Sequence, residues 1–189
     1  VCEICGVEEL QIPGSHNLEN ALAACAIAHF AGIDTEVIAK VLREFQGVEH
    51  RIELCNEIDG IRFVNDSKGT NPDAAIRAIE AMKRDIILIA GGYDKGASFD
   101  EFVSAFDGKV KALVLLGKTA TKIKDAAEKA GFTNTVILKD MEACVREAYR
   151  LAESGDVVLL SPACASWDMY TSFEQRGEHF KACVRELER

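Results

Sequence analysis

The sequence predicts an α/β fold: a Rossmann-like, mostly parallel six-stranded sheet with flanking helices, preceded by two separate helices. Two observations support this prediction. From about residue 50 onward, short apolar runs alternate with amphipathic helical patterns, as they do in βαβ units. Several of these runs, such as residues 86–90, show no alternation of apolar and polar residues, which is typical of strands buried on both faces.

The composition fits one full domain, or one domain and part of another. The chain has 189 residues, of which 48% are hydrophobic, enough for a sizeable core. Its net charge of −9 argues against unspecific nucleic-acid binding, which needs a basic surface. No apolar run approaches the ~18 residues of a membrane span, and no signal peptide is found. We therefore expect a cytoplasmic protein with no nucleic-acid or membrane partner and, because the chain begins with Val1, a piece of a longer one.

The seven cysteines indicate a reducing compartment. Cys2 and Cys5 form a C-x-x-C pair, but no second pair and no nearby histidine completes a zinc set, so we predict no metal site. Four other cysteines fall in helical patterns or follow a strand and are expected to be small buried residues: Cys25, Cys144, Cys164 and Cys183.

Two helical patterns precede the sheet. The first opens at Ser15, with Ser15 or Asn17 as its cap, and the second spans about residues 34–45. The linker that follows divides the chain into expected domains of residues 1–47 and 48–189. The second helix spaces five apolar residues for one buried face: Val37, Ile38, Val41, Leu42 and Phe45.

Turn and capping signals define the elements of the sheet region. Asp59-Gly60 predicts a hairpin, which makes the first strand the antiparallel edge. Asn71 followed by Pro72 predicts a capped helix start. Capping boxes are expected at Ser98 with Glu101 and at Ser172 with Gln175. Strands are expected at residues 51–57, 61–64, 86–90, 112–116, 135–138 and 156–160, with helices between the later ones.

Three turns at strand ends hold most of the chemically interesting side chains: residues 65–71, 91–96 and 161–168. The carboxyl ends of parallel strands share one edge of a sheet, where ligands bind in α/β proteins. Each turn alone could be an ordinary loop with solvated polar residues. Their convergence on one edge predicts a ligand site there.

Several common motifs are absent from the sequence. Gly117-Lys118-Thr119 resembles the tail of a phosphate-binding loop, but the glycine required five positions earlier is Ala112. No G-x-G-x-x-G follows a strand, which argues against a dinucleotide site. Ser161 and Ser166 lack the G-x-S-x-G elbow of serine hydrolases.

A series of motifs, in one order over nearly the whole chain, resembles the Mur ligases, which are ATP-dependent amide ligases of peptidoglycan precursor synthesis. The motifs are Gly14-Ser15-His16-Asn17-x-x-Asn20, Gly47-x-x-His50-Arg51-x-Glu53 and Asn65-Asp66-Ser67-Lys68-x-Thr70-Asn71-Pro72. Others resemble the branch that adds D-glutamate: Gly91-Gly92-x-x-Lys95, Ser161-Pro162-Ala163-Cys164-Ala165-Ser166-x-Asp168 and Phe173-Glu174-x-Arg176-Gly177. The resemblance implies the end of a central ATP-binding domain in residues 1–47 and a C-terminal glutamate ligase domain in residues 48–189.

The resemblance also implies roles for individual residues. The positions that hold D-glutamate in the family correspond to Thr70, Lys95, Ser166 and Phe173. The positions that face the nucleotide correspond to Asn17, Asn20, His50, Arg51 and Asp66. Lys68 is expected to support the turn that contains Asp66.

In such ligases ATP phosphorylates a carboxylate of the nucleotide-linked substrate, and the amine of the incoming amino acid displaces the phosphate. The implied substrates are ATP, D-glutamate and UDP-N-acetylmuramoyl-L-alanine, and a monomer is expected. The phosphate loop, a carbamylated lysine and the Mg²⁺ ligands belong to an upstream part of the central domain, so this chain alone is expected to be inactive. Two alternatives stay open: a ligase similar to folylpolyglutamate synthetase, and an α/β module that binds a ligand without catalysis.

Overall fold

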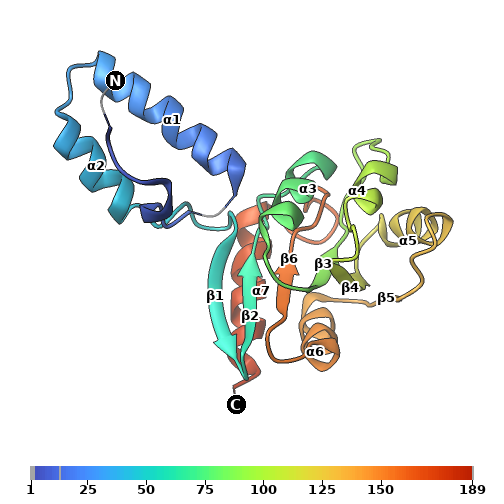
Figure 1. Ribbon diagram of the computed structural model, residues 1–189. Helices are drawn as coiled ribbons and strands as arrows, with labels where there is room; N and C mark the ends of the chain where they lie inside the picture. The colour runs from blue at the N-terminus through green and yellow to red at the C-terminus, as the bar shows by residue number, and fades with distance from the viewer. Residues whose placement is uncertain (1–2, 13, 189) are drawn as a thin grey trace. The chain divides into compact units, whose positions relative to one another are not determined.

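The computed structural model describes residues 3–12 and 14–188 of the chain. The chain divides into two compact units, one ending at Val48 and the other beginning at Glu49. The six-stranded sheet belongs to the second unit (Figure 1). No helix among the described residues is long and apolar enough to cross a membrane.

The first unit contains a short 3₁₀ helix, η1 (Val7–Glu9), and the helices α1 (Ser15–Phe30) and α2 (Thr35–Glu44). The predicted cap of α1 is wrong. Gly14 occupies the cap position with φ of 97°, and no side chain caps the helix, because Ser15 already lies inside it. Asp34 does cap α2, since its side chain accepts a hydrogen bond from the Glu36 N–H at 2.8 Å.

The predicted buried face of α2 is also largely wrong. The buried residues of α2 are Ile38 and Ala39, whereas Val37, Val41 and Phe45 are exposed. The predicted helix is present, but three of the five residues expected on its buried face are exposed in the described part of the chain. Amphipathic spacing predicts which residues share a face and does not supply the surface that covers it.

The second unit has the strand order β1-β2-β6-β3-β4-β5. The predicted hairpin is confirmed: β1 pairs with β2 in the antiparallel direction, and the turn residues Asp59 and Gly60 have φ of 52° and 77°. The other pairings are parallel, so β1 is the antiparallel edge. The strands are β1 (Glu53–Ile58), β2 (Ile61–Asn65), β3 (Ile86–Ala90), β4 (Val110–Leu115), β5 (Thr135–Ile137) and β6 (Val157–Leu160).

Helices cover both faces of the sheet (Figure 1). On one face, α3 (Pro72–Ala81), α4 (Asp100–Ser104) and α5 (Ala120–Lys129) bury apolar residues in a common core. On the other face, α6 (Met141–Leu151) and α7 (Phe173–Glu186) form a second core. Central strands are therefore buried on both faces, which explains why their sequences show no alternation.

Most predicted helix starts are confirmed. Asn71 caps α3 by accepting from the Ala74 N–H at 2.9 Å, and Ser172 caps α7 by accepting from the Gln175 N–H at 3.3 Å. The Ser98 and Glu101 box is wrong. The Ser98 hydroxyl donates to the Asp100 carboxylate at 2.7 Å, and α4 begins at Asp100 with the buried Phe99, not Ser98, at the cap position.

The cysteines among the described residues are free. Cys144, Cys164 and Cys183 are buried as predicted, whereas Cys25 is only partly buried. Cys2 lies outside the described residues, so nothing follows for its pairing with Cys5.

Candidate functional site

The three turns that the sequence singled out do meet at one edge of the sheet. They follow β2, β6 and β3, which are adjacent in the strand order. Gly91 (φ 114°) and Gly92 (φ 145°) let the chain turn sharply after β3. A Cβ atom at Gly91 would collide with the carbonyl oxygen of Leu116, and one at Gly92 with that of Ala165. Only glycine fits this conformation and this close approach.

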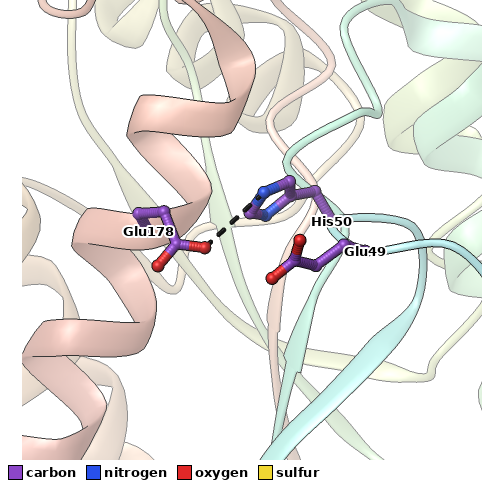
Figure 2. A group of neighbouring side chains, drawn as sticks. All are labelled: Glu49, His50 and Glu178. Atoms are coloured by element: carbon purple, nitrogen blue, oxygen red, sulfur yellow. Dashed lines mark ion pairs between the residues drawn. The ribbon is translucent and has the colours of Figure 1, made fainter.

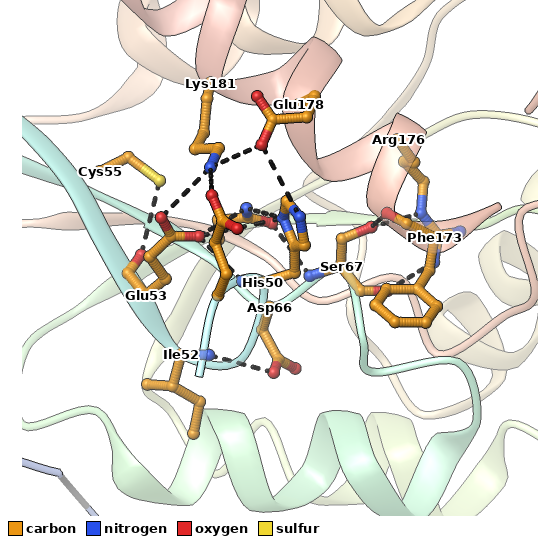
Figure 3. A network of polar contacts seen from close by, with 12 residues as sticks. His50, Ile52, Glu53, Cys55, Asp66, Ser67, Phe173, Arg176, Glu178 and Lys181 are labelled. Carbon is orange, nitrogen blue, oxygen red and sulfur yellow. Dashed lines mark hydrogen bonds and ion pairs between the residues drawn. The ribbon is translucent and has the colours of Figure 1, made fainter. Parts of the chain in front are cut away.

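The turn after β2 is anchored by a buried carboxylate. Asp66 is 4% exposed, and its Oδ2 accepts from the Ser161 hydroxyl at 2.6 Å, which links the turns after β2 and β6. Its Oδ1 accepts from the Ile52 N–H at 3.3 Å (Figure 3). Burial raises the pKa of the Asp66 carboxyl to about 6, against the opposing effect of these hydrogen bonds. Both carboxylate oxygens are therefore already engaged inside the unit.

Arg176, on α7, holds two of the turns together. The residue is 2% exposed, and its guanidinium donates to the Ser67 hydroxyl at 3.0 Å, the Ser67 carbonyl at 2.8 Å and the Cys164 carbonyl at 3.1 Å. The Ser67 hydroxyl in turn donates to the Phe173 carbonyl at 2.7 Å (Figure 3). No carboxylate among the described residues lies within ion-pair distance of Arg176. Burial lowers the pKa of its guanidinium to about 10.

The sequence alone assigns no role to Arg176, which enters only as part of a motif, between Phe173 and Gly177. A lone arginine in an amphipathic helix gives no local signal of burial. The signal that could have found it is its position three residues after a capped helix start, which places it on the helix turn nearest the sheet edge.

His50 belongs to a polar network between β1, β2 and α7. The residue is 5% exposed, and its Nδ1 lies 2.9 Å from the Asn65 amide nitrogen. The same nitrogen donates to Glu53 at 3.1 Å, while the Asn65 amide oxygen accepts from the Ser67 N–H at 3.1 Å. The His50 carbonyl accepts from the Lys68 N–H at 3.0 Å. His50 is thus fixed from several sides and faces into the unit.

Glu49, His50 and Glu178 form a cluster with ligand atoms within 4.8 Å of one another (Figure 2). This cluster does not fit Mg²⁺. The Lys181 ammonium already lies 2.7 Å from Glu49 and 2.7 Å from Glu178, where it satisfies the carboxylates that a metal ion would need. Mg²⁺ also prefers an all-oxygen octahedral set. We therefore assign this cluster to the internal packing of α7 against the start of β1.

Thr70 and Lys95 line a small depression that is partly open to solvent and has a cavity volume of about 30 Å³. Thr70 is partly buried, and Lys95 is exposed. Cys164 also lines the depression, so all three turns contribute to it. The structure therefore brings together two of the four residues expected to hold D-glutamate. The other two lie outside the lining: Ser166 is buried in the turn after β6, and Phe173 begins α7.

The five residues expected to face the nucleotide are divided between the two units. Asn17 and Asn20 lie on α1, where the Asn20 amide nitrogen donates to the Asn17 amide oxygen at 3.5 Å. Arg51 is exposed at the start of the second unit, whereas His50 and Asp66 are buried there.

Lys68 lies in the turn that it was expected to support. Its side chain is exposed, and its ammonium lies 5.8 Å from the centroid of the Phe173 ring. Its backbone N–H donates to the His50 carbonyl, as described above.

Comparisons with known proteins agree with this architecture. The family model described as "Mur ligase, glutamate ligase domain" matches residues 50–164. A protein of Thermoanaerobacter sp. (strain X514), named UDP-N-acetylmuramoylalanine--D-glutamate ligase, is 59% identical over 99% of this chain and 42% of its own length. A protein of the same name from Clostridioides difficile (strain 630) is 55% identical over 95% of this chain and 40% of its own. The chain thus spans about two fifths of these curated relatives.

Solved structures show the same fold at low sequence identity. UDP-N-acetylmuramate-alanine ligase from Thermotoga maritima superimposes with a TM-score of 0.72 at 20% identity, over 94% of this chain and 40% of that one. A bifunctional folylpolyglutamate synthase/dihydrofolate synthase from Yersinia pestis gives a TM-score of 0.67 at 17% identity, over 95% of this chain and 40% of that one.

Proposed function

This chain belongs to the Mur ligase family, and on that premise we propose that the longer protein adds D-glutamate to UDP-N-acetylmuramoyl-L-alanine in an ATP-dependent reaction. The relatives named for this activity are 52–59% identical to the chain over nearly all its length. The second unit is the glutamate ligase domain in this proposal. The first unit is the end of the central ATP-binding domain, and the protein is a cytoplasmic monomer.

The observation that carries the proposal is the depression at the sheet edge. A cation, Lys95, and a hydroxyl group, that of Thr70, lie beside it in a chain whose net charge is −9. D-glutamate has two carboxylates, so its binding to an acidic protein requires a local concentration of donors. An ammonium and a hydroxyl at one depression supply charge-assisted hydrogen bonds of the kind that a carboxylate accepts.

The chemistry that follows is amide formation from a carboxylic acid. A carboxylate is a poor electrophile, and ATP as co-substrate supplies the phosphate that leaves when the amine attacks. The contribution of this domain is to hold the amino acid so that its amine meets the activated carbonyl, which is catalysis by positioning. Lys95 and Thr70 bind carboxylate oxygens, and Ser166 and the Phe173 N–H at the start of α7 complete the set.

For the nucleotide we propose that some of the expected residues contact it directly and that others hold the contacting residues in place. The exposed guanidinium of Arg51 can neutralise phosphate, and the amides of Asn17 and Asn20 can bind polar groups of the nucleoside. Asp66 has both oxygens engaged, and one of them holds the Ile52 N–H next to Arg51. We therefore give Asp66, together with His50, the role of fixing the segment that presents Arg51.

The described residues of this chain offer no set that fits Mg²⁺, as the Lys181 contacts of the Glu49 cluster show. No step of the proposed reaction is therefore assigned to a metal held by this chain. The ligands of an Mg²⁺ ion that accompanies ATP are expected in the part of the longer protein that precedes this chain.

The experiment is a phosphate-release assay with the longer protein, ATP, UDP-N-acetylmuramoyl-L-alanine and D-glutamate. We expect release that requires all three substrates and falls to background when L-glutamate replaces D-glutamate. Turnover with a folate and L-glutamate would instead establish a folylpolyglutamate synthetase activity. The Yersinia pestis synthase has the same fold as this chain, which makes this the alternative to exclude. D-glutamate binding without any turnover would overturn the proposed ligase in favour of a binding module.

A further inference from the structure

Two exposed aromatic side chains lie beside Lys95, and neither belongs to the residues that the sequence singled out for binding. Trp167, in the turn after β6, is 63% exposed, and Tyr93, in the turn after β3, is 37% exposed. Their ring centroids are 5.7 Å apart. The backbone holds the two turns together at this point, because the Tyr93 N–H donates to the Ala165 carbonyl at 2.8 Å.

The ammonium group of a lysine lies over each of the two rings. The Lys95 ammonium lies 5.6 Å from the centroid of the Trp167 ring, and the Lys118 ammonium lies 5.9 Å from that of Tyr93. Both distances fall within the ~6 Å over which an aromatic face attracts a cation. The four side chains therefore alternate along the surface in the order Lys118, Tyr93, Trp167, Lys95.

Lys95 has no carboxylate partner within ion-pair distance among the described residues. Its neighbour Asp94 is already engaged, since the Asp94 carboxylate accepts from the Lys122 ammonium at 2.8 Å and from the Gly96 N–H at 2.7 Å. These contacts remove the nearest carboxylate that could otherwise neutralise Lys95. Within the described part of the chain, the Lys95 ammonium thus lies against an aromatic ring and not against an anion.

A ring and a carboxylate restrain an ammonium in different ways. A carboxylate pairs with the cation and competes with any incoming anion, whereas an aromatic face holds the cation and leaves its charge unpaired. We propose that Trp167 is a positioning residue that holds the Lys95 ammonium at the Thr70 depression, unpaired, for a carboxylate of the incoming amino acid. This inference rests on the proposed function, because it takes a dicarboxylic amino acid as the ligand of the depression.

The kinetic test uses the longer protein with Trp167→Leu and Trp167→Phe. Leucine keeps an apolar side chain but has no aromatic face, so we expect the KM for D-glutamate to rise by about threefold to fivefold with little change in the KM for ATP. Phenylalanine keeps a ring, and the KM should stay within about twofold of wild type. The matched control is Lys118→Met, which removes the other lysine that lies on a ring and should leave the KM for D-glutamate unchanged.

A double-mutant cycle separates positioning from a general structural effect. In a Lys95→Met background there is no ammonium to hold, so Trp167→Leu should no longer change the KM for D-glutamate. An equal rise in both backgrounds, or no rise in the wild-type background, would overturn the inference. Wild-type protein that does not use D-glutamate at all would refute the proposed function, which is a different result from unchanged kinetics in the variant.

The contact itself is testable without substrate. Trp167 is the only tryptophan of the 189-residue chain, so in this chain its fluorescence reports on this surface alone. Removing the cation in Lys95→Met should change the emission of Trp167, and Lys118→Met should change it less. Identical emission from wild type and Lys95→Met would show that the ammonium does not lie on the ring and would overturn the inference.

Discussion

The guanidinium of Arg176 donates two hydrogen bonds to Ser67, at 3.0 Å to its hydroxyl and at 2.8 Å to its carbonyl oxygen, across 109 residues of sequence. A third bond reaches the Cys164 carbonyl in the turn after β6. One side chain of α7 thus holds two of the three turns that form the candidate site. Since no carboxylate pairs with it among the described residues, these three bonds are what offset the cost of burying the charge.

Replacing Arg176 by methionine should destabilise the fold. The variant leaves the Ser67 and Cys164 carbonyls without their donor, at about 1–3 kcal/mol for each buried group. It also relieves a burial cost of about 3 kcal/mol, which corresponds to the lowering of the arginine pKa to about 10. The two carbonyls together cost about 2–6 kcal/mol, so the balance predicts a net loss of up to about 3 kcal/mol in the free energy of unfolding, measured by urea denaturation.

Arg185→Met is the matched control for this experiment, because Arg185 is exposed on the same helix. It should change the free energy of unfolding by less than about 0.5 kcal/mol. Arg176→Lys keeps the charge but cannot reproduce the forked geometry, and should fall between wild type and methionine. Equal stability of all four proteins would show that the Arg176 contacts do not hold the turns.

Asp66 should make the stability of the chain fall as pH rises from about 4 to 6. Burial raises the pKa of this carboxyl from 3.8 to about 6 in the folded protein, so in that window the folded state holds a proton that the unfolded state has released. Higher pH then favours unfolding, and the contribution of Asp66 to the free energy of unfolding is completely lost above about pH 7. A shift of about two pKa units corresponds to about 3 kcal/mol.

Asp66→Asn isolates this contribution, because asparagine has nearly the same shape and does not titrate. The difference in free energy of unfolding between the Asp66→Asn variant and wild type should grow in favour of the variant by about 1–3 kcal/mol between pH 4 and pH 8. Asp85→Asn, at an exposed aspartate, is the control. A difference that does not change with pH, measured by urea denaturation at each pH, would contradict the assignment.

Lys95→Met should impair the use of D-glutamate. The loss of a charge-assisted contact is expected to cost about 1.5–3 kcal/mol, which is about tenfold to a hundredfold in kcat/KM for D-glutamate. The KM for ATP should change much less, because the depression lined by Lys95 is assigned to the amino acid. Steady-state kinetics of the longer protein decide this. A raised KM for ATP with unchanged D-glutamate parameters would move Lys95 to the nucleotide side.

Asn65 should fix the tautomer of His50. The Asn65 amide oxygen accepts from the Ser67 N–H, so its nitrogen must face both Glu53 and His50 as a donor. The Nδ1 atom of His50 is then the acceptor, and the ring proton lies on Nε2, toward Glu178 at 3.7 Å. Nitrogen-15 chemical shifts of the imidazole should show this tautomer, and protonation on Nδ1 instead would contradict it.

The same contacts predict that Asn65→Asp is destabilising. The new carboxylate would lie about 3 Å from the Glu53 carboxylate in place of a donor, and would face the acceptor nitrogen of His50. We expect a loss of about 1–3 kcal/mol at pH 8. Asn71→Asp is the control, since aspartate accepts the α3 capping bond equally well. Thermal or urea denaturation compares the two variants.

The fold was largely predictable because its signals are local. Buried strands such as Ile86–Ala90, the Asp59-Gly60 turn and the Asn71-Pro72 helix start each depend on a few consecutive residues. Predictions were wrong where the burial of a side chain had to be inferred from the spacing of residues along one helix, without knowledge of the segment that packs against it. The apolar residues of α2 do share one stripe, but their burial depends on what packs against it.

The sequence by itself determined the strand and helix pattern, and with it the convergence of three turns on one edge, because parallel strands necessarily bring their carboxyl ends together. Its motifs supplied the candidate residues by resemblance. Only the tertiary structure decided that Asp66 and His50 face inward, that Arg176 is buried, and that Trp167 lies against Lys95. Periodicity is fixed within a turn of chain, whereas the partner of a side chain is chosen by packing between segments as far apart as Ser67 and Arg176.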